Sequence, residues 1–286
     1  MMRFRGVPLS LYCQQMSRNG QPALGKPLVV PRLPTEDELA APRAIVAVAQ
    51  DHQSAGETTH HTHPRGQLLY AARGTLTTTA EEGIWVAPPA RAIWVPAGVP
   101  HITRHSIGTE LRSVFVRKDA LAGLPTRCAV VRVSPLLREL LRAVTRLPSL
   151  YDEGGADGRL VRVLLDRIAT LPDEPLHLPT PASPKLRVIA DALAERPENK
   201  VSLARAARAA AMSPRSFARH FLAETGLSFG SWHRQARLLR ALELLGTGLR
   251  VGDVAFTLGY ESPSAFIAMF RRIFGTTPTR YFEGSN

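Results

Sequence analysis

Short apolar runs separated by turn residues occupy the region from Ile45 to about Val116. The clearest runs are IVAVA at 45–49, QLLYA at 67–71, IWVAP at 84–88, AIWVP at 92–96 and LRSVFV at 111–116. Runs of this length and spacing are typical of the strands of an antiparallel sandwich or barrel. The pattern therefore predicts a β-barrel over residues 41–120. It also predicts a poorly ordered lead-in over residues 1–40, where Pro, Arg and Gln occur without a sustained period.

Helical periodicity replaces the strand pattern within residues 121–171. Apolar residues recur there at steps of three and four, at Leu136, Leu137, Leu140, Leu141 and Val144, and again over 159–171. This spacing predicts two amphipathic helices, which either pack on the barrel or pair with a second copy of the chain. Five prolines then fall within LPDEPLHLPTPASP at 171–184. Proline at this density favours extended polyproline geometry, so residues 172–184 are predicted to be an interdomain linker.

One pattern occurs twice in the helical region 185–286. The first copy is LARAARAAAMSPRSFARHF at 203–221 and the second is VGDVAFTLGYESPSAFIAMF at 251–270. Each has a short helix of small or apolar residues, a tight turn, and then a Ser-Pro pair that places a cap and an N1 proline at the start of a second helix. Small residues such as Ala206, Ala207, Ala210 and Ala255 let the two helices cross closely, as a helix-turn-helix requires.

The outward face of each second helix follows from a rotation of 100° per residue. The inward stripes are Phe217 with Phe221, and Phe266 with Phe270 and Ile273. The opposite faces are small and basic, which suits close approach to a DNA major groove. The predicted DNA contacts are Arg215, Ser216, Arg219, His220, Ser264, Ala265, Ala268, Arg271 and Arg272.

A single long helix is predicted between the two copies, within 226–248. Trp232, Ala236, Leu239 and Leu242 form its apolar stripe. A rigid helix at this place would hold the two recognition helices at a fixed separation. A separation of roughly 34 Å would let both enter successive turns of one groove.

The charge of the chain points to the same region. The formal net charge is +12, which indicates a polyanionic partner. Residues 183–286 carry fifteen Lys and Arg against eight Asp and Glu, whereas residues 1–182 carry twenty-one against sixteen. The helical third is about twice as basic per residue, and it contains the repeated pattern. Nucleic acid is therefore favoured over an anionic membrane surface.

Residues 185–282 resemble the DNA-binding domain of the AraC/XylS family of bacterial transcription regulators. The resemblance is carried by Met212-Ser213-Pro214-Arg215, by the run from Asp253 to Tyr260, by Ser262-Pro263-Ser264, by Phe270-Arg271-Arg272 and by Gly275-Thr276-Thr277-Pro278. It implies two helix-turn-helix units that bind promoter DNA, a homodimer and contact with RNA polymerase. An activator role is the expectation, and the sequence itself leaves both activation and repression open. Two positions depart from the family. Ala211 replaces the usual glycine, at a cost on the order of 1 kcal/mol if φ is positive there, and Ala268 replaces an arginine found in many members.

Histidines form the candidate chemistry of the N-terminal half. His61 and His63 would project to one side of a strand, and a third histidine with a nearby amide would complete a site for a first-row divalent metal. The candidate metal or effector residues are His61, His63, Gln67 and His101. Their spacing resembles the two motifs of the cupin fold. Gln67 stands in the glutamate position, His105 in the terminal asparagine position, and Ala90 where the second motif usually opens with glycine.

The missing carboxylate leaves two interpretations of the histidines open. One is a divalent metal held in the barrel by a neutral ligand set. The other is a metal-free pocket in which the histidines hydrogen-bond within the barrel or contact an organic effector. The sequence establishes no cofactor, and it identifies neither the effector nor the operator.

These features together predict an α+β multidomain protein with an N-terminal cupin-like β-barrel, trailing helices, and a C-terminal all-α domain over 185–286. The expected function is sequence-specific transcription regulation by a barrel that senses a small molecule or a metal, without enzymatic activity. The alternatives are a metal-dependent cupin enzyme with a DNA-binding tail, and a basic DNA binder without sequence preference.

No apolar run approaches the 18–20 residues of a membrane span and no signal peptide is evident, so a cytoplasmic location is expected. Cys13 and Cys128 form no disulfide framework.

Overall fold

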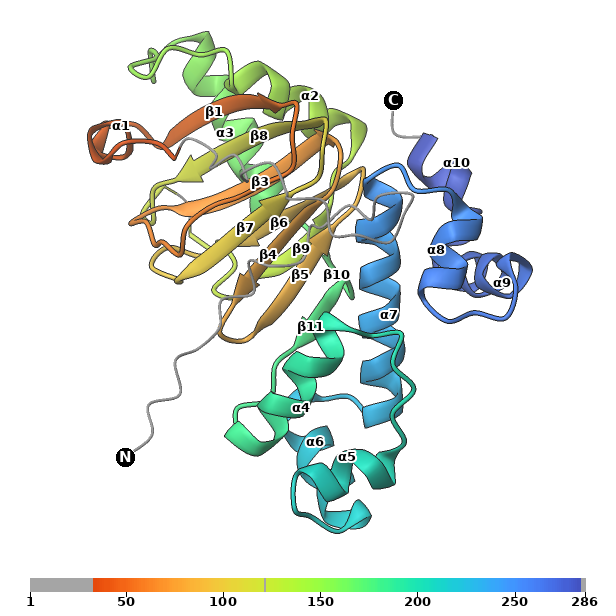
Figure 1. Ribbon diagram of the computed structural model, residues 1–286. Coiled ribbons are helices and arrows are strands. Elements are labelled where there is room, and N and C mark those ends of the chain that lie inside the picture. Colours follow the sequence, from red (N-terminus) through yellow and green to blue (C-terminus); the bar gives the residue numbers. More distant parts are fainter. Residues whose placement is uncertain (1–32, 121, 284–286) are drawn as a thin grey trace.

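The N-terminal half folds into two antiparallel sheets (Figure 1) in the computed structural model, which describes residues 33–120 and 122–283. In spatial order the first sheet contains β1 (Ile45–His52), β8 (Thr109–Val116), β3 (Gly66–Arg73), β6 (Arg91–Val95), β9 (Ala129–Arg132) and β10 (Asp173–Glu174). The second contains β11 (His177–Pro179), β5 (Gly83–Ala87), β4 (Leu76–Ala80), β7 (His101–His105) and β2 (Gly56–Glu57). The predicted apolar runs coincide with β1, β3, β5, β6 and β8, which confirms the strand-rich N-terminal domain.

Both faces of the first sheet are buried. Leu68 and Tyr70 of β3 contribute to one hydrophobic core, and Leu69 and Ala71 of the same strand contribute to another. This division follows from the alternation of side chains along a strand. Trp94 of β6 is 2% exposed and belongs to the first of these cores.

Two helices cover the outer face of the first sheet. α2 (Pro135–Val144) and α3 (Ala156–Ala169) contact each other and join the core that contains Leu68 and Tyr70 (Figure 1). Ser134 caps α2, with Pro135 in its first turn. Most of the apolar residues of both stripes are thus buried on the barrel, whereas Leu136 of α2 and Val163 of α3 are exposed. Packing on the barrel accounts for the buried residues, and pairing of the exposed residues with a second copy of the chain stays a prediction.

Three boundaries differ from those that the sequence pattern predicted. The barrel does not end at residue 120, because β9, β10 and β11 also belong to its sheets. Residues 172–184 are extended, but β10 pairs with β9 and β11 pairs with β5, so the Pro-rich segment is partly an edge of the barrel. This pairing is possible because prolines are tolerated on edge strands. Within the predicted lead-in, residues 1–32 lie outside the described residues, whereas Glu36–Ala40 form the short helix α1 with a capping box from Thr35.

The C-terminal domain is built on one long helix, α7 (Phe229–Gly246). α4 (Pro184–Glu195), α5 (Leu203–Ala209) and α6 (Pro214–Thr225) precede it, and α8 (Val251–Thr257), α9 (Pro263–Phe274) and α10 (Pro278–Glu283) follow it. The predicted stripe of Trp232, Ala236, Leu239 and Leu242 is buried along α7. The all-helical domain with a central connecting helix is therefore confirmed.

α7 also lies against the barrel (Figure 1), where it contacts β11 and β5. Trp232 Nε1 donates a hydrogen bond to the carbonyl oxygen of Pro179 at 2.8 Å, and Thr77 Oγ1 of β4 donates to Glu243 at 2.7 Å. Leu76 and Trp85 of the barrel belong to the same buried cluster as the apolar residues of α7. The two domains therefore share a core.

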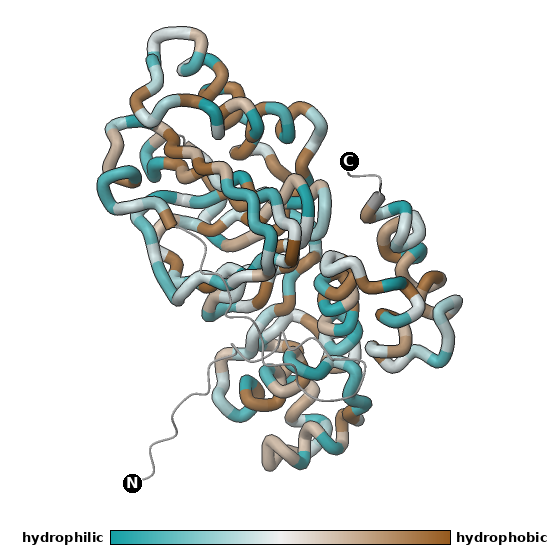
Figure 2. Tube along the Cα trace, turned by 45° about the horizontal axis from the view of Figure 1, so that its top comes forward, coloured by the Kyte–Doolittle hydropathy of each residue, from teal (hydrophilic) through white to brown (hydrophobic). Residues whose placement is uncertain are grey.

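Apolar and polar positions alternate along both domains, as the brown and teal segments of Figure 2 show. Among the described residues, no helix is both long enough and apolar enough to cross a membrane.

Candidate functional site

The first of the two predicted recognition helices is α6. Ser213 is its N-cap and accepts a hydrogen bond from the backbone N–H of Ser216 at 3.2 Å, with Pro214 in the first turn. Phe217 and Phe221 are fully buried, so the helix has one defined inward face. Three of the predicted DNA-contacting residues are exposed on the rest of α6, namely Arg215, Arg219 and His220, whereas Ser216 is half-buried.

The second predicted recognition helix, α9, repeats this arrangement. Ser262 caps it and Phe266 and Phe270 are fully buried. The remaining predicted DNA-contacting residues are all exposed, namely Ser264, Ala265, Ala268, Arg271 and Arg272. The prediction that Ile273 is buried was wrong, because its side chain is 48% exposed. Phe274 takes the inward position one residue later, since its ring lies 4.5 Å from that of Phe270 and 4.8 Å from that of Tyr281.

The two recognition helices lie at different ends of α7 (Figure 1). α6 leads into its N-terminal end, and α8 and α9 follow its C-terminal end. α5 packs on α6 and α8 packs on α9 through small residues, because Ala206, Ala207, Val254 and Ala255 are almost completely buried. The chain therefore presents two helix-turn-helix units with exposed, capped second helices.

The turn of the first unit contains a strained alanine. Ala211 has a φ of 54°, and Gly259, at the corresponding place in the second unit, has a φ of 74°. Both residues end a short helix in the same way, since the N–H of the following residue, Met212 or Tyr260, bonds back to Ala207 or Ala255. The left-handed conformation at helix ends favours glycine, because a Cβ is disfavoured there.

Replacing Ala211 with glycine is therefore expected to raise the free energy of unfolding by about 1 kcal/mol. The matched change in the opposite direction, Gly259→Ala, should lower it by a similar amount. Urea denaturation of both variants measures the two effects. A stability loss in Ala211→Gly would show that the conformation at this turn carries no strain.

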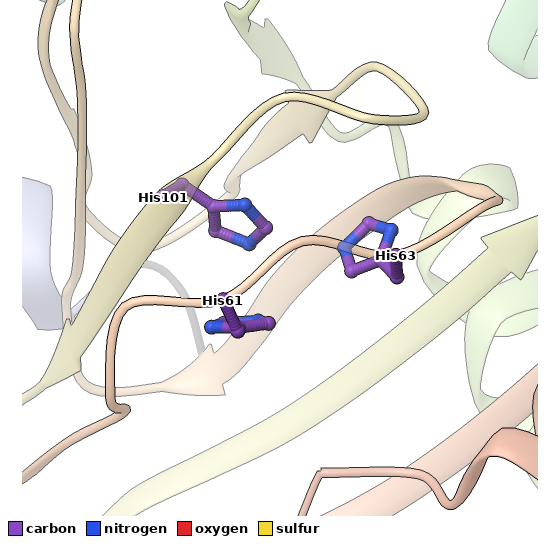
Figure 3. Close-up of side chains that lie close together, drawn as sticks. All are labelled: His61, His63 and His101. Carbon is purple, nitrogen blue, oxygen red and sulfur yellow. The ribbon is translucent and has the colours of Figure 1, made fainter.

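Three histidines converge inside the barrel (Figure 3). One ring nitrogen from each of His61, His63 and His101 lies within 4.8 Å of the other two. His101 is on β7, and His61 pairs with it through an isolated bridge, with N–H···O distances of 3.1 and 2.9 Å. The prediction that His61 and His63 lie on one regular strand was wrong, because His61 forms an isolated bridge and His63 lies in a loop. Their rings meet because this bridge fixes the loop on β7.

Each of these histidines has its Nδ1 close to a backbone carbonyl. The acceptors are Thr59 for His61 at 2.9 Å, Val99 for His101 at 2.9 Å and Arg65 for His63 at 2.5 Å. A carbonyl oxygen can only accept a hydrogen bond, so in the neutral rings the proton resides on Nδ1 and the lone pair on Nε2. A histidine that binds a metal characteristically donates its other ring N–H to a carbonyl in this way.

The Nε2 atoms of His61 and His101 are buried and have no hydrogen-bond partner among the described residues. His63 Nε2 lies 3.0 Å from the side-chain oxygen of Gln67, and the amide of Gln67 satisfies a lone pair there when its NH₂ group is turned toward the ring. A buried lone pair without a donor is costly. The Nε2 lone pairs of His61 and His101 are therefore open to a first-row divalent cation, whose preferred ligands include imidazole. His63 would supply the third ligand once the side chain of Gln67 turns away from its Nε2 atom.

Burial keeps these rings neutral. Desolvation is the largest cause that lowers the pKa of His61, His63 and His101, and the pKa of His101 falls to about 4. The hydrogen bonds to Thr59, Arg65 and Val99 oppose this shift without reversing it. At neutral pH the centre is therefore in the deprotonated form that a metal requires.

A second histidine pair lies nearby and was not foreseen. His52, at the end of β1, stacks on His105 of β7 with ring centroids 4.0 Å apart, and both Nε2 atoms are buried without a partner among the described residues. Desolvation lowers the pKa of His105 to about 4. A period of two along β7 would have placed His105 on the same inward side as His101, but no local signal brings His52 to it.

A cavity of about 360 Å³ opens beside the three-histidine centre. This volume lies within the range of small-molecule sites. Apolar and polar groups both line it, from Leu33, Pro34, Glu36, Leu39, Ala40, His61, Thr62, His63, Pro64 and Phe115. His101 does not line this cavity, so His61 and His63 are the two histidines that a ligand in it would meet.

Two family models match the chain. Residues 45–165 match the AraC-like ligand binding domain, and residues 206–284 match a helix-turn-helix domain. The HTH-type transcriptional regulator NimR of Escherichia coli is 39% identical over 221 residues, which cover 77% of this chain and 81% of NimR. The HTH-type transcriptional regulator RipA of Corynebacterium glutamicum is 31% identical over 136 residues, which cover 48% of this chain and 39% of RipA.

Solved structures show weaker overall similarity. ToxT from Vibrio cholerae has a TM-score of 0.36 at 11% identity, covering 84% of this chain and 97% of that one. The DNA-binding domain of AdpA in complex with a target DNA has a TM-score of 0.33 at 31% identity, covering 36% of this chain and 93% of that one. On the family models and the similarity to NimR, the chain belongs to the AraC family of transcription regulators, with an N-terminal ligand-binding domain and a C-terminal helix-turn-helix DNA-binding domain.

Proposed function

We propose that this AraC-family regulator binds promoter DNA through α6 and α9 and senses a divalent cation through His61, His63 and His101. The observation that carries the cation is the arrangement of the three rings, in which each Nδ1 lies next to a carbonyl and one nitrogen of each ring lies within 4.8 Å of the other two. Three imidazoles leave a fourth position open on a tetrahedral ion such as Zn²⁺. The cation would supply positive charge to a centre in which the Nε2 lone pairs of His61 and His101 have no partner among the described residues.

Metal binding by the full-length protein tests this function. Tag-free protein stripped of metal is expected to bind one Zn²⁺ or Co²⁺ per chain in calorimetry, because three preformed neutral ligands converge. His101→Ala should weaken binding by at least tenfold. His60→Ala, which removes an exposed neighbouring histidine, is the matched control and should bind like wild type. Equal affinities in all three proteins would exclude the three-histidine centre.

Regulation requires that the cation bind two states of the protein with different affinity. We expect cation binding to change the affinity of the full-length protein for operator DNA, and by reciprocity DNA should change its affinity for the cation.

A homodimer and contact with RNA polymerase in the cytoplasm belong to the same proposal. Support for a dimer comes from exposed apolar residues on the outer helices, namely Leu136 on α2 and Val163 on α3. The proposed role is regulatory, without catalysis.

Arg219→Ala is expected to weaken operator binding about tenfold, because an arginine contact in a groove contributes about 1–3 kcal/mol. Arg219 is exposed on α6, on the side away from the buried Phe217. Arg127→Ala removes the same charge from the barrel, where the side chain is 76% exposed, and serves as the control. Mobility-shift assays at moderate salt measure both variants. Unchanged affinity in Arg219→Ala would remove this residue from the DNA contacts.

A further inference from the structure

Arg65 is a buried cation in the loop that carries the histidines. Its side chain is 3% exposed, and it stands two residues from both His63 and Gln67. Its guanidinium donates three hydrogen bonds to backbone carbonyls, from Nε to Leu39 at 2.6 Å, from Nη2 to Ala41 at 2.6 Å and from Nη1 to Arg43 at 2.9 Å. A planar guanidinium is the side chain that can hold three acceptors in one fixed geometry.

These acceptors belong to the end of α1 and the turn that follows it. Carbonyls at a helix C-terminus have no partner within the helix, and they form its negative end. α1 has five residues, Glu36–Ala40, and none of them is buried. A helix this short has little stability of its own. The hydrogen bonds from Arg65 are therefore a major part of what holds α1 on the barrel.

α1 is also a wall of the cavity beside the histidines. Glu36, Leu39 and Ala40 line this space of about 360 Å³ together with His61 and His63. A movement of α1 away from the barrel would thus open the cavity.

The backbone of Arg65 contacts the histidine centre, whereas its side chain holds α1. Its carbonyl oxygen lies 2.5 Å from His63 Nδ1, so it fixes the orientation of that ring and leaves the lone pair on Nε2. One residue therefore contacts both a proposed metal ligand and the helix that closes the cavity.

We propose that Arg65 is a positioning residue that fastens α1 over the cavity beside the histidines and couples the docking of α1 to cation binding at the three-histidine centre. The coupling rests on the proposed metal-sensing function. Because coupling between two sites is reciprocal, a cation that orders His63 and the Arg65 carbonyl stabilises α1, and a docked α1 strengthens cation binding by the same factor.

Hydrogen exchange and metal titration of the full-length protein test this proposal together. In wild type, Co²⁺ should slow amide exchange in residues 35–43 at least tenfold. Arg65→Met should speed exchange of this segment without Co²⁺, abolish the Co²⁺-dependent protection, and weaken Co²⁺ binding about tenfold, as followed by visible absorption. Arg65→Lys should restore only a small part of the exchange protection and of the Co²⁺ affinity, because an ammonium group cannot reproduce the planar geometry of the guanidinium. Arg127→Met, at an exposed ion pair, should behave like wild type.

A second variant separates the coupling from a general loss of folding. Ala40→Pro disrupts α1 while it leaves Arg65 and the barrel strands unchanged, and it should weaken Co²⁺ binding as Arg65→Met does. Co²⁺-dependent protection that persists in Arg65→Met, or full Co²⁺ affinity in Ala40→Pro, would overturn the coupling. Wild-type protein that binds no Co²⁺ would instead overturn the metal-sensing function. The fastening role of Arg65 is tested without metal. Amide exchange of residues 35–43 that is as slow in metal-free Arg65→Met as in metal-free wild type would overturn that role.

Discussion

The metal-free protein is expected to lose stability steeply as the pH falls from about 6.5 to about 4. The pKa of His101 in the folded protein is lowered from 6.5 to about 4, chiefly by burial. Below pH 6.5 the unfolded chain therefore binds a proton that the folded chain does not, so the free energy of unfolding falls with decreasing pH. The loss ends near pH 4, where the folded protein also becomes protonated. For His101 alone it amounts to about 3 kcal/mol.

Other buried histidines act in the same direction. Burial also lowers the pKa of His52, His61, His63 and His105. Urea denaturation at pH 7.5, 5.5 and 4.5 measures the combined effect. His101→Gln, which does not titrate, should flatten the pH dependence relative to wild type, whereas the exposed His60→Gln should not. A free energy of unfolding that stays constant over this range would contradict the burial of neutral imidazoles in the barrel.

Gly246→Val is expected to lower the free energy of unfolding by about 3 kcal/mol, because overpacking a tight interface typically costs about 1–3 kcal/mol and valine adds two methyl groups beyond Cβ. Gly246 is the last residue of α7 and faces the barrel. A Cβ at this position would lie 2.6 Å from the Cβ of Thr75 in the loop before β4. Such a distance requires α7 or the loop to move, so the DNA-binding domain should separate partly from the barrel.

Gly230→Val is the matched control for this effect. Gly230 lies in the first turn of the same helix, and the nearest atom to a Cβ there is the flexible end of Arg234 at 3.6 Å. This variant should have nearly wild-type stability. Denaturation measures both proteins, and hydrogen exchange of residues 75–80 reports the loss of the interdomain contact. Equal stabilities of the two variants would show that close packing at Gly246 does not hold the domains together.

The elements of the DNA-binding domain are those that the sequence predicts best. Ser213-Pro214 and Ser262-Pro263 begin helices where expected, because capping depends on residues within one turn. Phe217, Phe221, Phe266 and Phe270 are buried as their spacing predicts. Ile273 was misplaced because helical spacing alone does not show where the neighbouring α10 ends the buried stripe, and Phe274 packs against that helix instead.

The sequence predicted which residues form the candidate centre in the barrel, but it did not predict the contacts that bring them together. The sequence named His61, His63, Gln67 and His101, and the structure brings the three histidines together and places Gln67 on His63. The bridge between His61 and His101 joins positions forty residues apart, so no local rule specifies it. The same holds for the stack of His52 on His105 and for the bonds of Arg65 to the end of α1.

The Pro-rich segment shows most clearly which features the sequence determines and which the tertiary structure decides. Its composition alone determined that residues 172–184 are extended, since proline restricts φ and cannot donate a hydrogen bond. The tertiary structure decided that this segment is the edge of both sheets, because β9 and β5 offer free edges to β10 and β11. Sequence patterns thus determined the two domains, their helices and the histidine set, because these depend on neighbouring residues. Only long-range pairing joined the domains, closed the cavity with α1 and gathered the rings.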